Sequence, residues 1–181
     1  RDTTAVDSFI GRSGILTHLK QTLERVTNVN GQMDMIVGEP GIGKSRLIDE
    51  LSSCARQKGM RVLFGRCYEE EGAPPYWPWV QVVRAYLSET PPEEISTMLG
   101  SRAPLVTAMF PELGEHLPGL EPFEAGSQDP EAVRFRLFDA VVSFLVDISN
   151  TSPTLIVLDD LHWSDDSSLK LLVFLARELE R

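Results

Sequence analysis

The chain has 181 residues, of which 42% are hydrophobic, and a formal net charge of −10. This length and apolar content suit one domain with a sizeable core, and the longest strongly apolar stretch, residues 155–158, is far too short to cross a bilayer. The negative charge argues against direct nucleic-acid binding by this segment, because nucleic-acid phosphates would repel it.

Two further features bear on where the protein works. No charged and then apolar stretch of the signal-peptide kind opens the chain, so we expect a cytoplasmic protein without a membrane partner. The two cysteines, Cys54 and Cys67, are too few for a disulfide framework and lack metal-ligand spacing. We interpret both as reduced structural residues.

The first part of the chain alternates between helical and strand patterns. Residues 12–26 and 45–56 carry apolar side chains at helical spacing, which predicts two helices with one buried face each. Residues 33–37 form a short apolar run that ends at a Gly/Pro cluster and predicts a buried strand. Residues 61–64, which follow Gly59, are a second strand candidate.

Residues 68–131 differ in composition from the sequence on either side. They hold two Lys or Arg against twelve Asp or Glu, and ten of the twelve prolines of the chain. We interpret this segment as an acidic, proline-rich helical insertion between a first half, residues 1–67, and a second half, residues 132–181. The shift in composition does not mark a separate domain.

Within this insertion, short helices are predicted at residues 79–87, 93–99 and 104–110, broken by prolines and glycines. Three of its aromatic residues, Tyr76, Trp77 and Trp79, lie close together among prolines. They could form a docking surface for a partner, or they could pack the insertion onto the core while the acidic side chains face water. We favour the second interpretation.

The C-terminal part regains a regular pattern. A helix is predicted to begin at Asp129, whose side chain can cap it, followed by the first-turn proline Pro130 and the early acid Glu131. It runs to about residue 148. Residues 155–158 are another buried strand candidate, and a last helix runs from Ser164 to residue 180. Because strands alternate with helices, we expect an α/β fold with a parallel sheet and flanking helices.

A complete phosphate-loop pattern, G-x-x-x-x-G-K-[ST], follows the first predicted strand. Its residues are Gly38, Glu39, Pro40, Gly41, Ile42, Gly43, Lys44 and Ser45, with Arg46 next. Glycines let several backbone N–H groups point at one phosphate chain, at the positive end of the following helix. Lys44 is expected to reach the β- and γ-phosphates, and the Ser45 hydroxyl to bind Mg²⁺.

The second half of such a site should be an acid at the carboxyl end of another buried strand. Asp159 and Asp160 directly follow the apolar run at 155–158. We predict that Asp159 holds Mg²⁺ and that Asp160 orients or deprotonates the attacking water. His162 beside them is interpreted as a local hydrogen-bond partner rather than a catalytic group.

Together these motifs resemble the origin-recognition-like AAA ATPase domain of STAND signalling ATPases, found in large LuxR-type regulators and beside cyclase domains. Besides the phosphate loop, the resemblance rests on five stretches, in order: Phe9-Ile10-Gly11-Arg12, Gly65-Arg66-Cys67-Tyr68, Pro74-Pro75-Tyr76-Trp77-Pro78-Trp79, Arg134-Phe135-Arg136-Leu137-Phe138 and Leu158-Asp159-Asp160-Leu161-His162-Trp163-Ser164-Asp165. It covers nearly the whole chain.

The resemblance has several implications. It places Phe9, Ile10, Gly11 and Arg12 near the adenine of ATP, although a hydrophobic staple at a helix start explains them equally well. It implies a sheet of order 5-1-4-3-2, of which strands 1, 2 and 3 can be found here. We therefore expect an incomplete domain that stops one helix after strand 3, exposes strand edges and is hard to keep soluble alone.

The leading functional hypothesis is a nucleotide switch in a multidomain bacterial signalling or transcriptional regulator, binding ATP and Mg²⁺ and hydrolysing ATP slowly. Its expected partners are the rest of its own domain, downstream output or sensor domains, and a second copy in a nucleotide-dependent manner. The alternatives are a non-hydrolysing ATP-binding module and a metabolic P-loop kinase. A kinase usually needs a basic lid, and the insertion is acidic.

Overall fold

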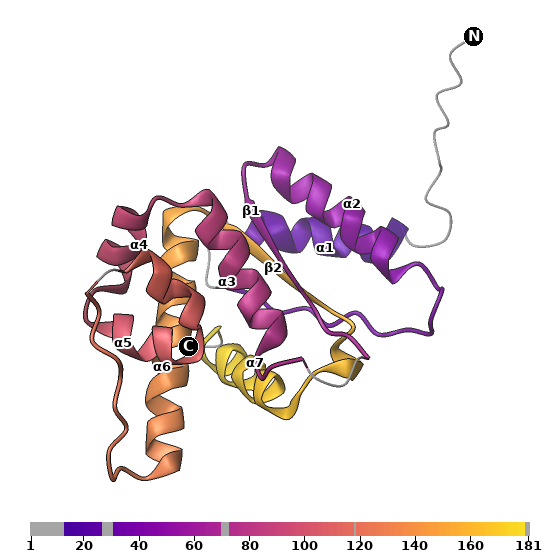
Figure 1. The fold of residues 1–181 in the computed structure, drawn as a ribbon. Helices are drawn as coiled ribbons and strands as arrows, with labels where there is room; N and C mark the ends of the chain where they lie inside the picture. Colours follow the sequence, from indigo (N-terminus) through magenta and orange to yellow (C-terminus); the bar gives the residue numbers. More distant parts are fainter. Residues whose placement is uncertain (1–12, 27–30, 70–72, 118, 180–181) are drawn as a thin grey trace.

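The computed structural model describes residues 13–26, 31–69, 73–117 and 119–179 (Figure 1). Two strands and seven α-helices are found in these ranges, with three short 3₁₀ helices. In chain order they are α1 (Ser13–Val26), α2 (Lys44–Gln57), β1 (Arg61–Arg66), α3 (Trp77–Glu89), α4 (Pro92–Leu99), η1 (Gly100–Arg102), α5 (Ala103–Met109), η2 (Pro111–His116), α6 (Pro130–Thr151), β2 (Thr154–Asp159), η3 (Leu161–Trp163) and α7 (Asp166–Leu179).

The two strands pair in parallel, as the alternation of strands and helices predicted. Arg61 lies opposite Thr154 at the start of the register, and Arg66 lies opposite Asp159 at its end. The carboxyl ends of both strands therefore meet at one edge of the sheet. The chain between β1 and β2 contains α3 to α6, and such a long helical connection is expected between parallel strands.

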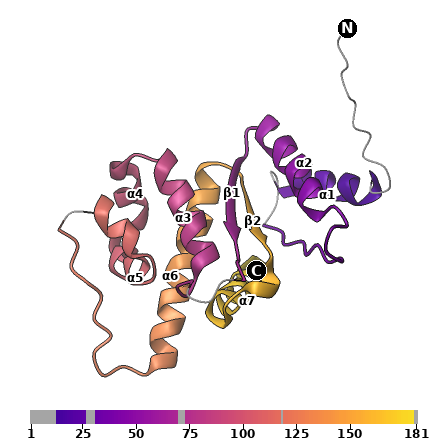
Figure 2. The ribbon, with the colours of Figure 1, turned by 45° about the vertical axis from the view of Figure 1, so that its right-hand side comes forward.

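Helices cover both faces of this small sheet (Figures 1 and 2). On one face, α1 and α2 bury a cluster that includes Leu19, Leu47 and Leu51, against which Val62 of β1 packs. On the other face, Leu63 joins a larger core that α3, α6 and α7 supply. Alternate residues of β1 thus point to opposite cores, the two-residue period of a strand.

The acidic segment packs into the larger core. Its helices α3, α4 and α5 share buried apolar residues with α6, and Figure 2 shows α4 and α5 beyond α3 and away from the sheet. Trp79 is only 1% exposed, and its indole Nε1 donates a hydrogen bond of 3.1 Å to the carbonyl of Ser168 in α7. Tyr76 and Trp77 are half-buried against the same core. The packing interpretation of these aromatics holds.

The predicted strand at residues 33–37 is wrong. The segment has no regular secondary structure, and Met35 and Val37 are 72% and 84% exposed, whereas Ile36 packs against the core under α1 and α2. A strand is held by a ladder of hydrogen bonds to a neighbour, and in the described sheet β1 and β2 pair with each other alone. Without such a partner, this apolar run forms no strand.

The strand predicted at 155–158 is present in β2, but it is half-buried along its length rather than fully buried. A two-stranded sheet leaves one edge of each strand without a further neighbour, so this exposure follows from the sheet's size. The predicted helices are confirmed with small changes in their ends. In α6, for example, the Asp129 carboxylate caps the first turn by accepting from the Ala132 N–H at 3.2 Å.

Candidate functional site

The phosphate-loop residues lie at the start of α2. Gly41 and Gly43 adopt left-handed backbone angles, with φ of 76° and 91°, which glycine accepts without strain. Gly43 occupies the N-cap position of α2, and no side chain bonds to the helix start there. A Cβ built on either glycine meets nothing within 4 Å, so the loop faces open space. An uncapped helix start in the open suits an anionic ligand.

Lys44 is folded back over its own loop. Its Nζ donates to the carbonyl oxygens of Gly38 and Glu39, at 2.8 and 3.0 Å. Ser45 and Arg46, which follow in the first turn of α2, are exposed. The ammonium group is thus held within the loop that a phosphate chain would enter, where it can exchange two neutral acceptors for charged ones.

The predicted acidic pair lies at the carboxyl end of β2. Asp159 is mostly buried, and its Oδ1 accepts from the Asp160 backbone N–H at 2.9 Å. Asp160 has a left-handed backbone with φ of 56°, unusual outside glycine, and its side chain is 41% exposed. The turn directs the two neighbouring carboxylates into different surroundings, one inside the strand end and one toward solvent.

Arg66, at the end of β1, contacts both carboxylates. Its Nη2 donates to Asp159 Oδ2 at 2.8 Å, and its Nε lies 4.0 Å from Asp160 Oδ2. The hydrogen bond and the charge of Asp159 raise the pKa of Arg66 above its ordinary value, so the guanidinium remains charged. Arg66 was not among the residues predicted for the site. The sequence did contain a signal for this contact: a basic residue lies just after one predicted parallel strand, and an acid directly follows the other.

The backbone of Arg66 is held from outside the sheet by Gln81 of α3. Gln81 Nε2 donates to the Arg66 carbonyl at 2.8 Å, and Gln81 Oε1 accepts from the Arg66 N–H at 3.3 Å. The amide side chain thereby supplies hydrogen bonds that a further strand would otherwise provide. It also ties the acidic segment directly to the strand end that faces Asp159.

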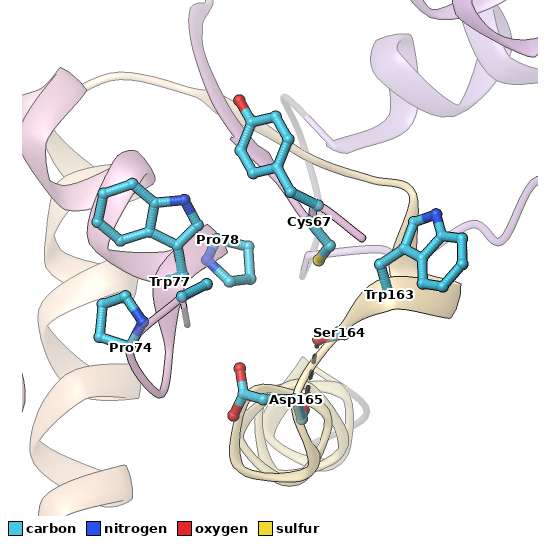
Figure 3. A pocket seen from close by; sticks show the side chains of 9 residues that line it. Cys67, Pro74, Trp77, Pro78, Trp163, Ser164 and Asp165 are labelled. Carbon is cyan, nitrogen blue, oxygen red and sulfur yellow. Dashed lines mark hydrogen bonds between the residues drawn. The ribbon is translucent and has the colours of Figure 1, made fainter. Parts of the chain in front are cut away.

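A pocket of about 180 Å³ opens beside this strand end (Figure 3). Trp77 and Pro74 approach it from the α3 side and Trp163 from η3, with Cys67 and Asp165 also in its lining. Burial raises the pKa of the Cys67 thiol, which keeps it protonated and unreactive at neutral pH. Both cysteines are free, as predicted.

Asp165 and His162 lie on either side of the same turn. The Asp165 carboxylate accepts from the Ser168 N–H at 2.9 Å, at the start of α7, and from the Tyr76 N–H at 3.3 Å. The His162 ring packs against Trp163 with centroids 4.9 Å apart. Asp165 thus fastens the beginning of α3 to the beginning of α7.

The described contacts do not join the two predicted halves of the site. Among the described residues, no hydrogen bond or ion pair joins Lys44 or Ser45 to Asp159 or Asp160. Phe9, Ile10, Gly11 and Arg12, the expected adenine contacts, lie outside the described residues. Within the described ranges, no three His, Cys, Asp or Glu side chains gather to hold a metal ion by themselves.

A parallel sheet between helical layers and a full phosphate-loop pattern at the start of α2 define a P-loop type α/β protein. The particular family follows from comparison with known proteins. The chain belongs to the AAA ATPase domain family, whose model matches residues 8–181.

The chain is also similar to an uncharacterized protein of Rhizobium meliloti (strain 1021). The two are 28% identical over 183 residues, a region that covers 93% of this chain and 17% of that protein. The chain therefore spans about a sixth of the length of the curated relative it matches. No solved structure matches the chain significantly. None of the described helices has both the length and the apolar character needed to cross a membrane.

Proposed function

We propose that this chain is the nucleotide-binding part of an ATP-driven switch of the origin-recognition-like STAND type. One observation carries the proposal: a complete phosphate-loop sequence forms an open, uncapped helix start with two left-handed glycines and with Lys44 folded over it. Such a loop provides converging N–H groups and one mobile cation, which is the chemistry that a triphosphate needs.

The residues present fit ATP and magnesium in their donor types. The loop from Gly38 to Gly43 would hold the phosphates with its N–H groups, and Lys44 would exchange its two carbonyl partners for phosphate oxygens. Ser45 and Asp159 offer the hydroxyl and carboxylate oxygens that Mg²⁺ prefers. Bound Mg²⁺ supplies neutralisation of charge on the β- and γ-phosphate oxygens. Asp160, next to Asp159 and 41% exposed, is the proposed group that orients the attacking water.

A switch needs a difference in affinity between two states. If one arrangement of the protein binds ATP and the other does not, nucleotide at 100 times its Kd favours the first by about 2.7 kcal/mol. Slow hydrolysis would then return the protein to its other arrangement. This energy is sufficient to invert an equilibrium between two domain arrangements that are nearly equal in stability.

The proposed setting is a multidomain regulator in the cytoplasm. The Rhizobium relative, of which this chain covers 17%, has ample length for sensor and output domains. We propose the rest of its own domain, such downstream domains and a second copy of the protein as partners. A role in signalling or transcription regulation rests on the resemblance of the motifs to STAND proteins.

Nucleotide titration of the full-length protein with Lys44→Ala tests the binding proposal. A hydrogen bond to a charged group contributes about 1.5–3 kcal/mol, so the Kd for a fluorescent ATP analogue should rise roughly 10- to 150-fold. Lys58→Ala is a matched control, because Lys58 lies at the other end of α2 and pairs with Glu24 at 3.1 Å. Equal affinity of the Lys44 variant and the parent protein would refute the proposed site.

Single-turnover hydrolysis separates a hydrolysing switch from a non-hydrolysing ATP-binding module. Asp160→Asn should retain ATP affinity and lower the rate of phosphate release by about 10²-fold or more, the usual contribution of a general base. Asp166→Asn, which changes an acid in the first turn of α7 that pairs with Lys170, serves as the control. If the parent protein releases no phosphate, the chain is a binding module alone.

A further inference from the structure

We propose that Arg66 is an internal counter-ion that holds the Asp159 carboxylate in the nucleotide-free protein and must release it before magnesium is bound. This inference rests on the proposed function and deepens it, because it names a residue that sets the magnesium requirement of the site. It assigns to Gln81 the role of positioning Arg66.

The contacts of Asp159 support this assignment. Its Oδ1 accepts from the Asp160 N–H, and its Oδ2 accepts from Arg66 Nη2 at 2.8 Å. Both carboxylate oxygens are therefore engaged by donors of the protein itself. A magnesium ion would have to approach a carboxylate whose charge the guanidinium already neutralises, so the two cations compete for one anion.

The position of Arg66 allows it to leave. Its side chain is 51% exposed, whereas Asp159 is only 15% exposed, so the arginine can swing toward solvent while the acid stays in place. Asp160 is an alternative partner already within 4.0 Å of Arg66 Nε. Release from Asp159 therefore leaves the guanidinium near a second carboxylate instead of stranding it.

Gln81 fixes the backbone position from which the Arg66 side chain would move. It bonds to both the N–H and the carbonyl of Arg66, and its Nε2 also lies 3.3 Å from the Trp77 carbonyl in the same helix. The backbone of Arg66 is thus fixed to α3, and only its side chain is free to change partners. Through these bonds α3 is connected to the carboxylate expected to hold magnesium.

The test measures the Mg²⁺ concentration that gives half-maximal binding of a fluorescent ATP analogue to the full-length protein. In Arg66→Ala and Arg66→Gln this concentration should fall about threefold to fivefold, the size expected for loss of one partly exposed ion pair. Arg134→Ala is the matched control, because Arg134 has a similar exposure, 48%, and pairs with Glu131 at 3.8 Å within the first turns of α6. It should leave the Mg²⁺ midpoint unchanged.

Gln81→Ala provides a second, independent measurement. It should lower the Mg²⁺ midpoint in the same direction as Arg66→Ala, and it should have no further effect in the Arg66→Ala background, because the two residues act through one contact. Both side chains lie outside the buried core, and thermal melting of each variant checks that the fold is retained.

The outcomes are distinguishable. An unchanged or raised Mg²⁺ midpoint in both Arg66 variants, with normal nucleotide binding by the parent protein, overturns the role of Arg66 and leaves the proposed function intact. Additive effects of Gln81→Ala and Arg66→Ala overturn the positioning role of Gln81. If the parent protein binds no nucleotide with or without Mg²⁺, the proposed function fails and this inference fails with it.

Discussion

Replacing Gly65 with alanine should destabilise the contact between β1 and α3. A Cβ built on Gly65 lies 2.1 Å from the carbonyl oxygen of Pro78, 2.7 Å from its carbonyl carbon and 3.0 Å from its Cα. All three are backbone atoms, which cannot rotate away as a side chain does. Close carbon–oxygen contacts in proteins lie at about 3.3 Å or more, so the first turn of α3 would have to retreat by about 1.2 Å.

A shift of this size propagates into the core because Trp79, the next residue of α3, is fully buried. Forcing an extra methyl group into such packing typically costs about 1–3 kcal/mol. We expect a value near 2 kcal/mol, which lowers the urea midpoint by about 1 M at a typical slope of 2 kcal/mol/M. Urea titration followed by tryptophan emission measures it in the full-length protein.

Gly14→Ala is the control for this change. Gly14 lies in α1, and a Cβ built there meets nothing within 4 Å. Alanine should therefore be neutral or stabilise the helix by up to about 1 kcal/mol. If Gly65→Ala and Gly14→Ala had the same urea midpoint and slope, the close approach of Pro78 to β1 would be refuted.

Three further predictions concern the helices and the buried thiol. Asp129→Ala, which removes the cap of α6, should lower the free energy of unfolding by about 1 kcal/mol in urea titrations, whereas Asp129→Asn should largely retain it. Trp79→Phe leaves the Ser168 carbonyl without its indole donor and should cost about 1–3 kcal/mol by thermal melting; an unchanged melting temperature would contradict this bond. Because burial raises the pKa of Cys67, its thiolate fraction at pH 7–8 is depressed, so iodoacetamide should label the less buried Cys54 first, and Cys67 should catch up as pH rises.

Much of the secondary structure could be predicted because its causes are local. Apolar side chains at helical spacing predicted α1 and α2, and Asp129 with the proline after it predicted the start of α6. The phosphate-loop pattern likewise lies where it was expected, at the start of α2. The roles of Lys44 and Asp159 in binding nucleotide and magnesium stay predictions.

The strand expected at residues 33–37 shows where local reasoning fails. The composition of the run suits a strand, but a strand exists through hydrogen bonds to a neighbour, and the described sheet offers it none. The segment that precedes the phosphate loop therefore depends on partners that its own residues cannot specify.

By itself, the sequence determined which segments are helical, where the phosphate loop begins and which acids end a strand, because helical periodicity, capping and glycine turns act over a few residues. Only the tertiary structure decided that Arg66 meets Asp159, 93 positions away, and that Gln81 of α3 holds the backbone of Arg66. Both contacts follow from the parallel register of β1 and β2 and from the packing of α3 on β1. Register and packing depend on how distant segments fit together, which no local pattern encodes.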